Sequence, residues 1–140
     1  MQETIFDPLR KKEVALTPEE RVRQWFIGVM SDVMGIPRHM MMSEAGFRYG
    51  DKQYRSDIIV WNRDATPLAV VECKRPETVL DASVLEQAIR YNMVLNVKYI
   101  IITNGLKIFA FQRSGAASFE MTATLPKWEE MLQKTGETKL

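Results

Sequence analysis

The chain has 140 residues, of which 46% are hydrophobic and 26% charged, and this length and composition fit one globular domain with its own core. Lys and Arg number 19 against 18 Asp and Glu, so the formal charge of +1 gives no overall sign of a polyanion-binding protein. A single Cys73 and a single His39 exclude an internal disulfide and metal sites built from several Cys or His side chains. Any bound metal would therefore be held by oxygen ligands.

The first predicted helix spans residues 17–35 and follows a leading arm, residues 1–16. Thr17 suits the N-cap, and Glu20 stands where it completes a capping box. Apolar side chains recur along this helix at the spacing of one face, which we expect to be buried. The two bulky aromatic residues assigned to that buried face are Trp25 and Phe26.

Two strands are predicted next, over residues 54–61 and 68–74. The first is rich in β-branched and aromatic residues. The second contains Leu68-Ala69-Val70-Val71, a continuous apolar run typical of a central strand that is buried on both faces. Residues 38–49 do not distinguish a loop from a strand.

The second half of the chain predicts a helix and a β-hairpin. The helix starts at a capping box, Ser83-Val84-Leu85-Glu86, and continues to about residue 96. Asn104-Gly105 between two β-forming runs predicts a hairpin with a type I′ turn. A short helix is expected over residues 126–135. This mixture of helices and strands around a sheet favours an α/β or α+β fold.

Segments that would target the chain to a membrane or carry a nucleotide motor are not found in the sequence. No run approaches the roughly 18 apolar residues that a membrane span needs. The N-terminal residues have neither the basic start nor the apolar stretch of a signal peptide, which favours a cytoplasmic location. A P-loop motif for nucleotide binding is also missing from the 140 residues.

Three polar residues at predicted strand ends could carry chemistry. Asp57 opens one strand, while Glu72 and Lys74 close the next and point to the same face. If the two strands pair as a hairpin, Asp57 and Glu72 lie near its open end and can share a ligand. Two carboxylates that hold a divalent cation beside a lysine can hydrolyse a phosphodiester bond. The alternative is that Glu72 and Lys74 form an ordinary surface ion pair.

Other polar side chains near this site allow two interpretations. Gln87 and Tyr91 are four residues apart on the second helix, so they share a face that either reaches the site or is simply its polar shoulder. Basic residues precede Asp57 and follow Glu72, where they form either a local phosphate-binding surface or a normal solvated face. They are Arg48, Lys52, Arg55, Lys74, Arg75 and Arg90.

Asp57, Glu72-Cys73-Lys74 and the helix segment 87–91 together resemble the PD-(D/E)xK nuclease superfamily, in its branch with a Q-x-x-x-Y helix. The likeness is to the N-terminal nuclease domain of type I restriction enzyme R (HsdR-type) subunits, and it covers roughly residues 6–112. The further segments that resemble this group are Phe6-Asp7-Pro8, residues 16–24, residues 72–76 and Thr103-Asn104-Gly105.

The resemblance implies a restriction-endonuclease-like α/β core with a mixed central β-sheet flanked by helices. This nuclease domain would span residues 17–125, between the arm 1–16 and a C-terminal helix and tail, residues 126–140. It implies Mg²⁺, with Mn²⁺ as a substitute, held by Asp57, Glu72 and the backbone carbonyl of Cys73.

The resemblance also implies roles for further side chains. Lys74 would be the catalytic lysine, and Gln87 would support the site or touch the substrate. Glu20 matches a position where relatives place an extra acidic group facing the metal, and its alternative role is helix capping. The residues expected to contact the substrate are Tyr91, Arg55, Arg75 and Arg90.

The implied function is a Mg²⁺-dependent DNA endonuclease domain of a type I restriction-modification system. The expected partners are DNA and either restriction-modification subunits or a motor protein supplied in trans, because these 140 residues contain no ATP-driven motor. Ser56 departs from the family pattern, since a proline is expected before the motif aspartate. The alternatives are a non-catalytic DNA- or partner-binding module with the same fold, and a purely structural interaction protein.

Overall fold

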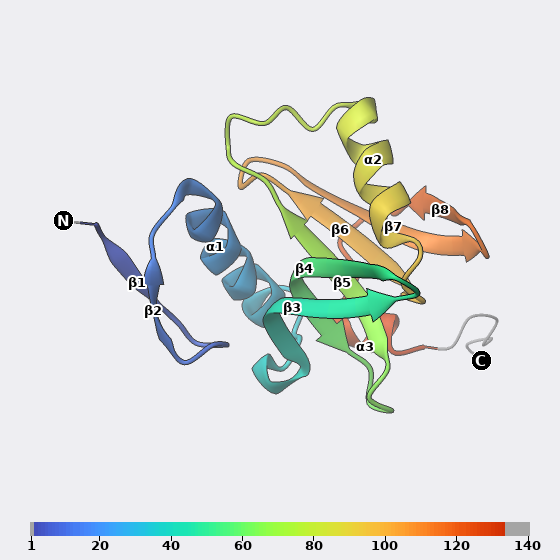
Figure 1. The fold of residues 1–140 in the computed structure, drawn as a ribbon. Helices are drawn as coiled ribbons and strands as arrows, with labels where there is room; N and C mark the ends of the chain where they lie inside the picture. Colours follow the sequence, from blue (N-terminus) through green and yellow to red (C-terminus); the bar gives the residue numbers. More distant parts are fainter. Residues whose placement is uncertain (1, 134–140) are drawn as a thin grey trace.

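A computed structural model describes residues 2–133, apart from the side chains at positions 45, 47 and 49. Figure 1 shows its helices and strands, coloured along the chain. The elements also include one 3-10 turn, η1. They are β1 (Thr4–Asp7), β2 (Lys12–Ala15), α1 (Pro18–Asp32), η1 (Arg38–Met40), β3 (Met41–Tyr49), β4 (Lys52–Trp61), β5 (Pro67–Cys73), α2 (Ala82–Asn92), β6 (Tyr99–Thr103), β7 (Ile108–Gly115), β8 (Ser118–Met121) and α3 (Trp128–Met131).

The main sheet has six strands in the order β3-β4-β5-β6-β7-β8. β5 and β6 are parallel and are connected through α2, whereas the other neighbouring pairs are antiparallel. This mixed sheet with helices on both faces confirms the predicted α/β class. Strands β1 and β2 form a separate antiparallel hairpin from residues of the predicted arm.

Two clusters of buried side chains hold helices on opposite faces of the sheet. One joins Phe26 of α1 to Val71 of β5, and the other joins Leu85 of α2 to Val70 of β5. Successive residues of β5 therefore enter different cores, which confirms the prediction of a central strand buried on both faces. Within residues 2–133, none of the helices has the length and apolar character needed to cross a lipid bilayer.

The start of α1 follows the prediction in part. The Thr17 side chain accepts a hydrogen bond from the Glu20 N–H at 3.1 Å, as expected for an N-cap. The Glu20 carboxylate does not return to Thr17, whose own N–H donates to the Ala15 carbonyl. The expectation for Trp25 is wrong, because 44% of this residue is exposed while Phe26 is fully buried. The buried residues Val22, Arg23, Ile27 and Met30 lie beside Phe26 or on its Ile27 side, and Trp25 is on the other side of Phe26, turned away from the core.

Two local predictions in the second half are wrong in detail. Helix α2 is capped by Asp81, whose carboxylate accepts from the Val84 N–H at 2.9 Å, so the helix starts before the predicted Ser83 box. The β6–β7 turn is not type I′, which needs positive φ at both central residues. Gly105 has φ 88° but Asn104 does not have positive φ, and the Asn104 side chain instead accepts from the Leu106 and Lys107 N–H groups.

The C-terminal helix is shorter than expected. α3 spans Trp128–Met131 and buries both of its terminal residues against the α1 side of the sheet. Residues 134 and 135 of the predicted helix lie outside the described part of the chain.

Candidate active site

Strands β4 and β5 separate at the point where their acidic residues stand. Their ladder ends at the pair Ile58↔Val71, so Asp57 and Glu72 are the next residue on each strand. Beyond this point the two backbones no longer pair, and the space between them opens as a pocket of ≈ 240 Å³. The residues lining this pocket are Glu19, Arg55, Ser56, Asp57, Val71, Glu72, Cys73, Lys74 and Asn92. The structure thus brings Asp57, Glu72 and Lys74 together.

Asp57 is held from two sides. Its Oδ2 accepts a hydrogen bond from the Cys73 N–H at 2.7 Å, and its Oδ1 lies 3.0 Å from Nη2 of Arg23. Burial raises the pKa of Asp57 above its ordinary value, although the Cys73 N–H and the Arg23 guanidinium oppose this effect. The carboxylate is therefore oriented by fixed partners and only partly open to solvent.

Glu72 in β5 and Lys74, the first residue after β5, lie on the same side, as strand alternation predicts. Lys74 Nζ is 2.9 Å from Glu72 Oε2, and Asn92 of α2 donates to Glu72 Oε1 at 3.3 Å. Asn92 also donates to the Ala88 carbonyl at 2.8 Å, which fixes its amide within the helix. Lys74 is more than one-third exposed, so its ammonium can reach a ligand in the pocket.

Cys73 points away from the pocket into the core beneath α1. Burial raises the pKa of its thiol well above the ordinary value, so the side chain is an unreactive apolar group. Its backbone faces the other way, because the Cys73 N–H is directed at Asp57. In a β-strand the N–H and C=O of one residue face the same neighbour, so the Cys73 carbonyl is directed towards the pocket as well.

Glu20 is buried on α1 and belongs to a chain of ion pairs that ends at Asp57. Its Oε1 lies 2.6 Å from Arg23 and 2.7 Å from Arg10, and Gln24 donates to its Oε2 at 3.0 Å. Arg10 in turn pairs with the fully buried Asp7. Glu20 does not line the pocket, and its neighbour Glu19 does. Glu20 is therefore connected to Asp57 through Arg23 and does not face the pocket itself.

Gln87 and Tyr91 line a second pocket of ≈ 350 Å³, which shares Glu72 and Lys74 with the first. Gln87 is exposed on α2. The Tyr91 hydroxyl accepts a hydrogen bond from the Arg55 N–H at 3.3 Å. Both residues thus border the site, and neither makes a hydrogen bond among those described to Asp57 or Glu72.

The basic residues predicted to contact substrate are exposed, and two of them have acidic partners. Arg55 lines the Asp57 pocket and pairs with Glu44. Arg75 lies 3.6 Å from Glu77. Arg90 is exposed on α2. All are available to a large ligand, and their binding roles stay predictions.

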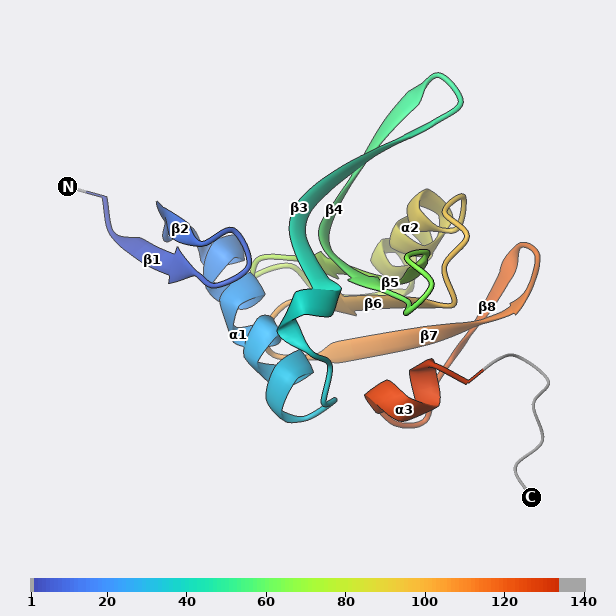
Figure 2. The same ribbon diagram turned by 90° about the horizontal axis from the view of Figure 1, so that it is seen from below.

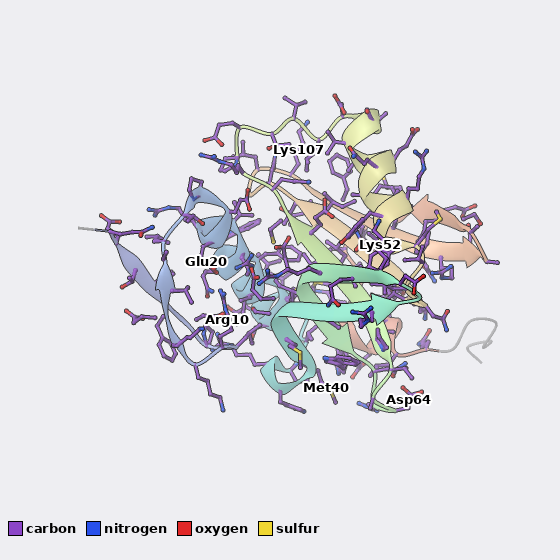
Figure 3. All side chains as sticks on the ribbon, viewed as in Figure 1. Arg10, Glu20, Met40, Lys52, Asp64 and Lys107 are labelled. Carbon is purple, nitrogen blue, oxygen red and sulfur yellow. The ribbon has the colours of Figure 1, made fainter. Side chains whose placement is uncertain are left out.

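Sequence reasoning missed Arg23 and Asn92, which hold the two carboxylates. Both are polar residues on otherwise apolar helix faces, with Arg23 in line with Ile27 and Met30, and Asn92 in line with Leu85 and Ala88. A charged or amide side chain at a buried helical position needs a partner, and this was the available signal. Figure 3 shows the Arg10 and Glu20 side chains on the side of α1 that faces the β1–β2 hairpin.

The donor set fits a hard divalent cation such as Mg²⁺. Asp57 and Glu72 supply carboxylate oxygens, and each oxygen can accept more than the one hydrogen bond or ion pair given above. The Cys73 carbonyl adds a third oxygen. Within residues 2–133, no three Asp, Glu, His or Cys side chains gather as a metal-binding group, so backbone, solvent or substrate oxygens would complete the coordination.

Two solved structures share this fold. One is the fragment of a candidate HsdR subunit of a type I restriction enzyme from Vibrio vulnificus YJ016, with 22% identity and a TM-score of 0.61. This chain aligns over 83% of its own length but only 24% of that chain. Another is a candidate nuclease belonging to DUF820 from Anabaena variabilis ATCC 29413, with 10% identity, a TM-score of 0.51, and coverage of 92% of this chain and 89% of that chain.

The family follows from the sequence. Residues 18–126 match the family described as "Type I restriction enzyme R protein N terminus (HSDR_N)". This match spans more than half of the chain, so the chain belongs to that family, which confirms the resemblance drawn from its motifs. A search of the curated proteins finds no relative.

Proposed function

We propose that this domain is a Mg²⁺-dependent DNA endonuclease that hydrolyses phosphodiester bonds. The observation that carries the proposal is the meeting of Asp57, Glu72 and Lys74 in one pocket where β4 and β5 separate. Membership of the restriction-enzyme family supports DNA as the substrate. We further propose that the domain works in the cytoplasm with restriction-modification subunits or a motor protein supplied in trans.

Each residue of the pocket has a distinct task in this proposal. Asp57, Glu72 and the Cys73 carbonyl would hold Mg²⁺, or Mn²⁺ as a substitute. Such a cation, when bound, supplies Lewis-acid polarisation of the phosphoryl oxygen and a more acidic water. Asn92 and Arg23 orient the two carboxylates before any ligand arrives.

Lys74 places a positive charge at the mouth of the pocket. Its contact with Glu72 holds the ammonium beside the metal ligands. There the ammonium can stabilise charge that develops on the phosphate or orient the attacking water, whereas it would have to lose its own proton to solvent before the neutral amine could take one from that water. Gln87 borders the same two residues from α2 and is available to contact the substrate backbone.

The test is cleavage of supercoiled plasmid with Mg²⁺ or Mn²⁺ by the full chain and three variants. Lys74→Met keeps the aliphatic stem and removes the charge, and Asp57→Asn keeps the shape of a metal ligand. Lys12→Met, in the separate β1–β2 hairpin, is the matched control. We expect the first two variants to lose about 100-fold or more in rate, and the control to match the original protein.

Folding of every variant is checked by circular dichroism, and Mg²⁺ binding is measured by calorimetry. Equal cleavage by Lys74→Met and the unmodified protein would refute the role of the lysine. A folded protein that binds duplex DNA but cuts no single-stranded, duplex or branched substrate with either metal would be the non-catalytic binding module instead.

A further inference from the structure

Strands β3 and β4 continue beyond the main sheet as a two-stranded ribbon, defined here as residues 45–56. The β3–β4 ladder continues to the pair Tyr49↔Lys52, whereas β4 pairs with β5 only from Ile58 onwards among the described residues. Figure 2 shows this ribbon curving away from the sheet on the side of the sheet where α2 lies. A projecting ribbon buries little of the core, so its shape needs another explanation.

The ribbon is locally basic in a chain that is nearly neutral overall. It contains Arg48, Lys52 and Arg55 against one acidic residue, Asp51. Arg48 stands opposite Gln53, and Arg55 is two residues further along the same strand, so these three side chains share one face. All three are exposed hydrogen-bond donors, although Arg55 also pairs with Glu44, which directly precedes the ribbon. Such a face suits phosphate oxygens and the acceptor edges of bases.

The Gln53 side chain lies over Gly46, which stands opposite Arg55. A Cβ atom at Gly46 would lie only 2.9 Å from Nε2 of Gln53. The missing side chain therefore leaves room for the Gln53 amide to lie across the ribbon, between the positions of Arg48 and Arg55.

The ribbon is braced against α2 by Tyr91. The Tyr91 hydroxyl accepts from the Arg55 N–H, and its ring centroid lies 5.0 Å from that of Tyr54. Lys52 Nζ lies 4.9 Å from the Tyr54 ring and 5.2 Å from the Tyr91 ring. Figure 3 places Lys52 next to α2. These contacts hold the ribbon in one orientation, which lowers the entropy cost of binding with it.

The ribbon also begins at the candidate active site. Arg55, two residues before Asp57 in β4, lines the same pocket as Asp57. A polyanion held along the ribbon would therefore enter the pocket at its root. Each strand of the ribbon has five residues, 45–49 and 52–56, and is about 16 Å long at ~3.3 Å per residue, which corresponds to about 5 base pairs at ~3.4 Å each.

We propose that this ribbon docks in the major groove of duplex DNA and directs the duplex to the Asp57 pocket. The major groove is about 12 Å wide and accepts a two-stranded β-ribbon, whereas the deep, narrow major groove of an RNA duplex does not. The inference rests on the proposed function in taking DNA as the substrate. It adds the surface through which that DNA is held.

The test measures fluorescence anisotropy of a labelled DNA duplex of about 20 base pairs, its single strand, and an RNA duplex of the same sequence. EDTA is present, so that binding is measured without cleavage. The proteins are the full chain, Arg48→Gln, and the matched control Arg63→Gln. Arg63 is also exposed but lies in the β4–β5 turn, at the opposite end of the sheet from the pocket.

We expect the unmodified protein to prefer the DNA duplex. Removal of one phosphate contact by Arg48→Gln should reduce the salt slope by about 0.9. Between roughly 50 and 200 mM salt, the unmodified protein then loses about 3.5-fold more affinity for the DNA duplex than Arg48→Gln does. Arg63→Gln should keep the full slope, and Arg48→Gln should change single-strand and RNA binding little.

The proposed role of the ribbon is refuted if Arg48→Gln binds the DNA duplex with the original affinity and salt slope. It is also refuted if Arg48→Gln loses the same affinity for all three nucleic acids, or if Arg63→Gln loses as much affinity for the DNA duplex as Arg48→Gln does. Absence of any DNA binding refutes it too. The two proposals fail separately. If the protein cleaves DNA but Arg48→Gln leaves the salt slope unchanged, the nuclease proposal stands and the ribbon proposal fails. If Arg48→Gln reduces the slope but the protein shows no metal-dependent cleavage, the ribbon proposal stands and the nuclease proposal fails.

Discussion

Replacement of Arg23 by methionine tests whether the ion pairs behind Asp57 hold the site together. Arg23 is 5% exposed and touches three carboxylates, at 2.6 Å from Glu20, 2.7 Å from Glu44 and 3.0 Å from Asp57. Methionine keeps most of the apolar stem and removes the charge. The change therefore isolates the electrostatic contribution of this side chain.

The expected cost follows from which carboxylates keep a cation. Glu20 retains Arg10 and Glu44 retains Arg55, whereas Asp57 loses its described guanidinium partner and keeps the Cys73 N–H. Leaving a buried charge without its partner costs about 3–5 kcal/mol, so we expect the free energy of unfolding to fall by that amount at about pH 7. Arg55→Met is the control, since its side chain is 72% exposed and should cost less than about 1 kcal/mol.

The pH dependence of this cost has a definite sign. Burial already raises the pKa of Asp57, and Arg23 opposes that rise. Without Arg23 the pKa of Asp57 rises further, so this carboxyl group is protonated at a higher pH. As the pH falls, the cost of its buried negative charge, including the repulsion from Glu72, disappears. The difference in unfolding free energy between the original protein and Arg23→Met should therefore shrink from about pH 7 to about pH 5.

Urea denaturation at both pH values, followed by circular dichroism, measures these differences. A double-mutant cycle with Asp57→Asn should give a coupling energy of about 1–3 kcal/mol between the two residues. A cost below about 1 kcal/mol at neutral pH, or a cost that does not change with pH, would refute the assignment of Arg23 as the partner of a charged Asp57.

Three further predictions use urea denaturation or thiol chemistry. Asp7→Asn should lower the free energy of unfolding by about 1–3 kcal/mol at about pH 6. Burial alone would raise the Asp7 pKa, but the Arg10 and Leu9 hydrogen bonds lower it overall, so the stability that the carboxylate contributes is lost as the pH falls below about 4. A cost of Asp7→Asn that persists below that pH would contradict this prediction. The buried Cys73 thiol should react with an aromatic disulfide reagent only after unfolding, and rapid reaction of the native protein would show the assignment to be wrong. Gly105→Ala should destabilise the protein by about 1–2 kcal/mol, because the φ of Gly105 is 88° and a Cβ would lie 3.2 Å from Val22 Cγ2. Gly28→Ala within α1 meets nothing within 4 Å and should stabilise the protein by about 0.5–1 kcal/mol. A change of unfolding free energy in the same direction for both variants would refute this prediction.

Local patterns in the sequence predicted the features that depend on neighbours in the chain. The apolar run before Glu72 predicted a doubly buried strand, and alternation along that strand predicted that Glu72 and Lys74 share a face. The hairpin arrangement that places Asp57 beside Glu72 followed from two strands separated by a short turn. The catalytic roles of these three residues stay predictions.

The contacts that hold those residues could not be predicted in the same way. Arg23 lies 34 positions from Asp57, and Asn92 lies 20 positions from Glu72, so their meeting depends on how helices pack across the sheet. The length of the ribbon was missed for a similar reason, since residues 41–49 gain their strand geometry by pairing with β4. At α2, two acceptable caps stood close together in the sequence, and Asp81 rather than Ser83 was selected.

The β1–β2 hairpin has a practical consequence for choosing where to cut the gene. The family match starts at residue 18, and an expression fragment trimmed to that boundary would omit Asp7 and Arg10. Glu20 would then lose one of its two guanidinium contacts, and Arg23 would be drawn more strongly towards it and away from Asp57. An inactive trimmed fragment would therefore be poor evidence against the proposed catalysis, because the trimming itself would disturb the aspartate that the proposal assigns to the metal site.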